Sequence, residues 1–67
     1  MASTWTIQDK DGKQLGEVNA MSAKIAFILY MSDKGKSLSL KDVKTEAMPD
    51  GRTQVTHRGK VHFLKKG

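Results

Sequence analysis

The sequence predicts an α+β fold in which one helix packs on one face of an antiparallel sheet. Three observations lead to this expectation. The longest apolar run extends from Ala23 to Met31 and has the length of a short helix. The segments before and after it are short, and several alternate apolar and polar residues as half-buried strands do. Two Asp-Gly pairs, Asp11-Gly12 and Asp50-Gly51, lie between such segments and are typical of hairpin turns.

The 67 residues predict a single small domain that spans residues 1–67. A chain of this length buries only about 60% of its unfolded surface, so it depends on close packing or on a partner. It contains no cysteine, which removes disulfides and thiolate metal sites from consideration. We find no basic leader with an apolar stretch and no apolar run long enough for a bilayer. We therefore expect a cytoplasmic protein without a membrane partner.

Residues 4–8 and 14–20 predict the first hairpin. The first segment alternates, which places Trp5 and Ile7 on one face and threonines on the other. Between the two segments, Gly12 accepts the positive φ that a tight turn requires. In the return strand, we expect Gly16 to leave room for the Trp5 ring.

The apolar run predicts a helix of about three turns, because Ser22 is a suitable N-cap and Gly35 a suitable stop. On a helical wheel its apolar residues form two stripes instead of one. The first stripe holds Met21, Ile25, Ile28 and Leu29, and the second holds Ala23, Ala26, Phe27 and Tyr30. One stripe is enough to cover a sheet, and little chain remains to cover the other. We therefore expect a protein interface, in a homodimer or with another chain, that involves Ile25, Ile28, Leu29 and Tyr30.

Residues 39–47 allow two interpretations. Ser39 is a suitable cap for a second helix, which would point to a winged helix-turn-helix, whereas residues 43–47 alternate as a strand does. We favour the strand, because the Met-Pro-Asp-Gly-Arg sequence of residues 48–52 is a good hairpin turn. The pairs that this hairpin predicts are Val43 with His57, Thr45 with Val55 and Ala47 with Thr53.

Residues 60–65 predict the last strand, which follows a tight turn or bulge at Arg58-Gly59. Within this strand, we expect Val61 and Phe63 to point inward. The two or three strands after the helix then complete the sheet. Trp5, Phe27 and Tyr30 also fit core positions. We therefore expect no aromatic surface on which bases could stack.

The net charge of +5 comes from 12 basic and 7 acidic residues and is unevenly distributed. From residue 51 onward the chain has five lysines and arginines and no acidic residue. Such a cluster predicts a polyanionic partner, either nucleic acid or an acidic or nucleoprotein surface, although it also suits a solvated face. We expect Arg52 and Arg58 to share one face of a strand, joined by residues across the turn. The candidate contact residues are Lys44, Arg52, Arg58, Lys60, His62, Lys65 and Lys66.

The chain contains no recognisable catalytic or metal-binding pattern. His57 and His62 have no cysteines and few acidic residues nearby, and on one unbroken strand they would point to opposite faces. The acidic loop at residues 9–13 is too short for an EF-hand. The Gly35-Lys36-Ser37 sequence has only the last letters of a phosphate loop, and no serine lies in a nucleophile elbow. We therefore expect no enzyme activity, no cofactor, no metal and no small-molecule substrate.

The segment Thr6-Ile7-Gln8-Asp9-Lys10-Asp11-Gly12 leads through Val18-Asn19-Ala20 to Ser22-Ala23-Lys24-Ile25-Ala26, and a basic hairpin follows. This layout resembles that of small phage-encoded proteins, including some anti-CRISPR proteins of type I systems. The resemblance implies a protein that occupies a surface of a nucleoprotein complex in a bacterial host cell and has no chemistry of its own. It assigns no role to any individual residue.

These observations together predict a non-enzymatic basic protein that acts on nucleic acid or a nucleoprotein complex through its C-terminal hairpin. Two alternatives remain open. The first is a phage-encoded inhibitor that docks on a protein surface. The second is a structural homo-oligomer that uses whichever stripe of the helix does not cover the sheet.

Overall fold

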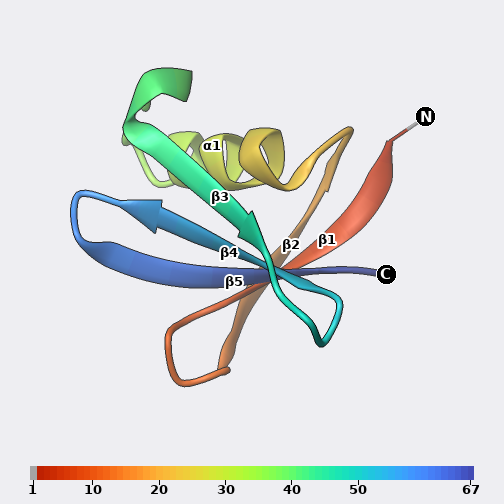
Figure 1. Ribbon diagram of the computed structural model, residues 1–67. Helices are drawn as coiled ribbons and strands as arrows, with labels where there is room; N and C mark the ends of the chain where they lie inside the picture. Colours follow the sequence, from red (N-terminus) through yellow and green to blue (C-terminus); the bar gives the residue numbers. More distant parts are fainter. Residues whose placement is uncertain (1) are drawn as a thin grey trace.

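In the computed structural model, which describes residues 2–67, one helix lies across one face of a five-stranded antiparallel sheet (Figure 1). This arrangement confirms the predicted α+β fold. The elements are β1 (Ser3–Gln8), β2 (Gln14–Ala20), α1 (Ala23–Asp33), a 3₁₀ turn (Leu40–Asp42), β3 (Val43–Ala47), β4 (Arg52–His57) and β5 (Lys60–Lys66). The strand order is β2-β1-β5-β4-β3, so β5 occupies the centre and joins the N-terminal hairpin to the C-terminal strands.

Helix α1 begins and ends at the residues that the sequence indicated. The Ser22 hydroxyl accepts a hydrogen bond of 3.3 Å from the Ile25 backbone N–H, as an N-cap does. After Asp33 the chain leaves the helix through Gly35, whose φ of 84° is disfavoured for residues with a Cβ. Among residues 2–67, no helix is long and apolar enough to cross a membrane.

The core lies between α1 and the sheet, and it uses the second helix stripe. Phe27 is its largest fully buried side chain. Tyr30, the last member of this stripe, is only partly buried, whereas its neighbour Met31 is buried. The buried apolar side chains are Ile7, Ala20, Ala23, Ala26, Phe27, Met31, Val43, Val55 and Leu64.

Gly16 makes room for Tyr30 and not for Trp5, which corrects the prediction. A Cβ built on Gly16 would lie 3.5 Å from Cε1 of Tyr30. Trp5 pairs instead with Val18 and is partly buried, and its Nε1–H donates a 3.1 Å hydrogen bond to the Ala20 carbonyl. The helix therefore approaches β2 closely at the one strand position that has no side chain.

The C-terminal strands have the predicted register. Val43 pairs with His57, and Thr45 with Val55, on either side of the Pro-Asp-Gly turn. The helical interpretation of residues 39–47 is wrong, because the helical part is only the 3₁₀ turn at residues 40–42. Ser39 does act as a cap, but of this short turn, by accepting a hydrogen bond from the Lys41 N–H.

The predicted inward face of the last strand is wrong. Leu64 is fully buried and lies opposite Ile7, so His62 shares its helix side, whereas Val61 and Phe63 face the other way. Strand β5 has apolar residues on both faces, so its sequence pattern alone does not determine which face points toward the helix. The position of β5 beside Ile7 in the centre of the sheet decides it.

Candidate nucleic-acid interface

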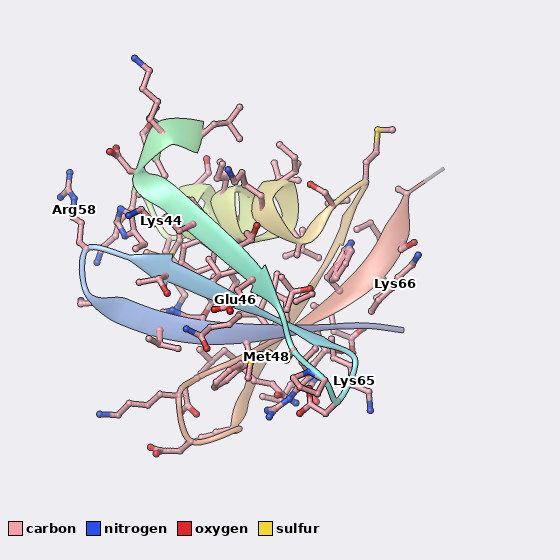
Figure 2. All side chains as sticks on the ribbon, viewed as in Figure 1. Lys44, Glu46, Met48, Arg58, Lys65 and Lys66 are labelled. Atoms are coloured by element: carbon pink, nitrogen blue, oxygen red, sulfur yellow. The ribbon has the colours of Figure 1, made fainter. Side chains whose placement is uncertain are left out.

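The strand register divides the predicted basic residues between the two faces of the sheet, so they do not form one continuous face. On the open face, which α1 does not cover, lie Lys44, Arg52 and Lys65. On the helix side lie Lys60, His62 and Lys66. Arg58 belongs to the β4–β5 turn. Figure 2 shows Lys65 and Lys66 leaving β5 in different directions and Arg58 at the tip of the turn.

Phe63 occupies the middle of the open face, because β5 is the central strand. Its cross-strand neighbours in register are Gln8 on β1 and Gln54 on β4. The ring is therefore flanked by two side-chain amides, which can both donate and accept hydrogen bonds. The sequence pattern missed this feature because it assigned Phe63 to the core.

The guanidinium of Arg52 lies over the Phe63 ring, with its central carbon 4.5 Å from the ring centre. Its Nε–H donates to Oδ2 of Asp50 at 2.7 Å, and Nη1 donates to Oε1 of Gln8 at 3.3 Å. Among residues 2–67, two of the five N–H donors of the guanidinium are thus used. The stacked group is held in place and keeps donors for another molecule.

Asp50 is the counter-ion of Arg52 in the only salt bridge found among residues 2–67. The Arg52 backbone N–H and its guanidinium both donate to the Asp50 carboxylate and hold its pKa below the ordinary value. Because this carboxylate is exposed, its role is to orient Arg52 and not to add much stability.

The basic side chains of the open face are grouped at its two ends. Lys65 lies opposite Arg52 at one end, and Lys44 lies opposite Thr56 at the other. Glu46 is placed between them on β3, as Figure 2 shows. The positive charge of this face therefore lies near Arg52 with Lys65 and near Lys44, while its central row presents Phe63 between Gln8 and Gln54, with Glu46 beyond Gln54.

On the helix side, a pocket of about 400 Å³ lies where the loop after α1 meets the β4–β5 turn. Arg58 in this turn has a φ of 49°, in the left-handed region that costs a residue with a Cβ about 1–3 kcal/mol. Lys36 and Ser37 belong to the pocket and were not among the predicted contact residues. The only sequence signal at these positions is the partial phosphate-loop motif of residues 35–37. The lining residues are Met31, Lys36, Ser37, Leu38, His57, Arg58 and Lys60.

The two histidines lie on neighbouring strands and on the same face, not on opposite faces, because the turn at residues 58–59 separates them. Both pack on Phe27, with ring centres 6.3 Å away for His57 and 5.0 Å away for His62. Burial lowers the pKa of His62. Within residues 2–67, no group of three histidine, cysteine or acidic residues is placed to hold a metal ion. The imidazoles therefore contribute to the core, and His62 is not on the open face.

The predicted protein interface on α1 is also divided. Ile25 and Leu29 are exposed, as is Met21, which lies two residues before the helix. Ile28 and Tyr30 are partly buried and pack against the core. The ammonium of Lys34 lies 5.0 Å from the centre of the Tyr30 ring and covers part of it. The outer surface of the helix is therefore the stripe of Met21, Ile25 and Leu29.

The chain matches no family model, no curated protein and no solved structure. A function for it has to follow from the residues and their geometry.

Proposed function

We propose that the protein binds single-stranded nucleic acid on the open face of its sheet, without catalysing a reaction. The observation that carries the proposal is the stack of Arg52 on Phe63 in the middle of this face, at 4.5 Å. Aromatic rings and guanidinium planes are the groups on which exposed bases stack, and each stacked base contributes about 1–3 kcal/mol. In a duplex the faces of the bases are occupied by their neighbours, so a single strand suits this surface better.

The neighbours of the stack support the same proposal. Gln8 and Gln54 flank Phe63 in register and offer amide groups to the edges of a base. Lys65 lies beside Arg52, and its ammonium can contact the phosphates of the strand together with the guanidinium donors that Asp50 and Gln8 leave free. Base stacking and phosphate contact are thus available within one small area.

The experiment is a binding titration of labelled oligothymidine and oligouridine at low salt, followed by fluorescence anisotropy. Phe63→Leu keeps an apolar side chain but removes the aromatic ring, and Arg52→Gln removes the charge and the guanidinium plane. Each variant is expected to weaken binding by roughly 5- to 150-fold, which corresponds to one lost base stack. With Lys44, Arg52 and Lys65 in contact, the slope of log affinity against log salt should be roughly −2.

Lys34→Gln is the matched control, because it removes a cation that also lies over an aromatic ring but on the helix. This variant should bind as the wild type does, apart from the small effect of net charge. The proposal is overturned if the wild type binds neither oligonucleotide. It is also overturned if Phe63→Leu and Arg52→Gln bind no more weakly than Lys34→Gln.

A second candidate function is that of an inhibitor that docks on a protein surface, as the sequence resemblance implies. The observation that favours it is the outer stripe of α1, where Met21 is 78% and Leu29 is 46% exposed. Exposed apolar side chains that gather on one face are typical of protein contacts. A pull-down from a bacterial host lysate with and without nuclease separates the two candidates. A partner that survives nuclease treatment and is lost with Leu29→Lys supports docking, whereas loss of every partner on nuclease treatment contradicts it.

A further inference from the structure

We infer that the protein has a second binding site, for a phosphoryl group, in the pocket between the loop after α1 and the β4–β5 turn. This site lies on the helix side of the sheet, whereas Phe63 lies on the open face. It goes beyond the proposed function and is carried by different residues.

The pocket gathers positive charge from two parts of the chain that are distant in sequence. Lys36 comes from the loop after α1, and Arg58 and Lys60 come from the β4–β5 turn and the start of β5. None of the described residues that line the pocket is acidic. In the part of the chain that the structure describes, none of these three side chains takes part in a salt bridge. Cations that share a pocket repel one another, and an anion bound between them would relieve this repulsion.

The backbone conformation of Arg58 is unfavourable for an arginine, and asparagine, aspartate or glycine would adopt it more easily. Arg58 and Gly59 both have positive φ, 49° and 79°, as in the two-residue hairpin turns that favour Asn, Asp or Gly at the first position. An arginine in the left-handed region is strained, and strain of this kind clusters at ligand sites. Arg58 is thereby one of the residues that line the pocket, and Figure 2 shows it at the tip of the hairpin.

The remaining lining residues suit a phosphoryl group. The Ser37 hydroxyl can donate a hydrogen bond to a phosphate oxygen, and His57 is only 8% exposed where it forms part of the wall. Nε2 of His57 is buried and has no hydrogen-bond partner among the described residues. Met31 and Leu38 supply an apolar part of the lining, which lowers the local dielectric and strengthens the attraction between charges.

The charge and size of the pocket indicate which anion it takes. A phosphate monoester carries a charge of about −1.5 to −2 at neutral pH and offers three acceptor oxygens, which matches three cationic side chains. The volume of about 400 Å³ is in the range of small-ligand sites and admits a phosphoryl group with an attached moiety. Inorganic phosphate, a nucleoside monophosphate and the 5′ end of an oligonucleotide all present this chemistry.

The test is a set of titrations followed in ¹H–¹⁵N spectra, with inorganic phosphate, adenosine monophosphate and a 5′-phosphorylated oligonucleotide as probes. Adenosine, the 5′-hydroxyl oligonucleotide and chloride at matched ionic strength are the reference ligands. We expect saturable shifts of the amides of Lys36, Ser37, Arg58, Gly59 and Lys60 with at least one phosphorylated probe. The probe that saturates the shifts of the pocket amides at the lowest concentration in Phe63→Leu, in which the open-face contact is weakened, identifies the source of the phosphoryl group.

Arg58→Asn is the decisive variant, because asparagine suits the left-handed conformation and therefore keeps the turn while it removes the cation. It should weaken phosphate binding by roughly tenfold or more, as loss of a charge-assisted hydrogen bond does. Lys13→Gln, which removes an exposed lysine from the β1–β2 connection, is the control and should leave the affinity unchanged.

Phe63→Leu should also leave phosphate binding intact, so failure of this site and failure of the proposed function can be told apart. The inference is overturned if no phosphorylated probe gives saturable shifts at the pocket. It is equally overturned if Arg58→Asn has the phosphate affinity of the wild type, or if the reference ligands shift the amides of the pocket as strongly as the phosphorylated probes do.

Discussion

The imidazole of His62 lies against the ring of Phe27, with the two ring centres 5.0 Å apart and the ring planes tilted by 51°. Nδ1 of His62 is buried and has no hydrogen-bond partner within residues 2–67. The contact joins the largest core residue of α1 to the central strand of the sheet. The small core thus contains a neutral polar ring, and this has consequences for both packing and pH dependence.

Phe27→Ala should lower the free energy of unfolding by about 3–5 kcal/mol, because it leaves a cavity between α1 and the sheet. This loss would be a large part of the stability of so small a domain. Urea unfolding followed by Trp5 fluorescence measures it, with Phe27→Leu as a milder substitution at the same site. A loss below roughly 1 kcal/mol for Phe27→Ala would contradict the central position of this ring.

Acidification should destabilise the protein through His62. Burial lowers the pKa of this imidazole in the folded state, and Lys60 and His57 act in the same direction, while Asp9 opposes them. The unfolded chain therefore binds the proton more readily than the folded one. The stability that His62 contributes is complete above its unfolded pKa of about 6.5 and is lost as the pH falls below that value toward the lower folded pKa.

Unfolding free energies measured between about pH 7.5 and pH 5.5 test this prediction, because carboxylates stay largely ionised over that range. His62→Leu should flatten the dependence on pH, leaving only the contribution of other groups. An equally steep loss of stability in this variant, or a gain of stability on acidification, would contradict the assignment to His62.

The outer stripe of α1 predicts different effects for two adjacent residues. Leu29 is exposed and Ile28 packs against the core, so Leu29→Lys should change the unfolding free energy by about 0.5 kcal/mol or less, and Ile28→Lys by more. If the stripe joins two copies of the chain, the wild type sediments as a dimer at micromolar concentration and Leu29→Lys as a monomer. A wild type that is monomeric under these conditions excludes the homodimer.

Local signals in the sequence were sufficient for much of the fold. The hydroxyl of Ser22 caps α1 because its position just before the apolar run leaves an N–H of the first turn within reach. The Pro-Asp-Gly turn set the register of β3 and β4, since a short loop leaves few ways to align its two strands. These features depend on neighbours within a few residues, which is why the sequence alone revealed them.

The candidate sites depended on contacts between distant segments. The direction of Phe63 follows from the pairing of β5 with β1, which places Leu64 beside Ile7 in the core. Lys36 reaches the pocket with Arg58 because α1 runs toward the β4–β5 turn, a relationship that no local pattern contains. The charge count indicated a polyanionic partner, but only the sheet register showed how the basic side chains are divided between two faces.

The most direct test of the central claim is to map the contact surface of a short oligothymidine by chemical-shift changes in ¹H–¹⁵N and aromatic ¹H–¹³C spectra. We predict the largest changes at Gln8, Arg52, Gln54 and the Phe63 ring, with contacts between this ring and base protons. Changes confined to the outer stripe of α1, or no changes at low salt, would contradict a nucleic-acid interface on the open face of the sheet.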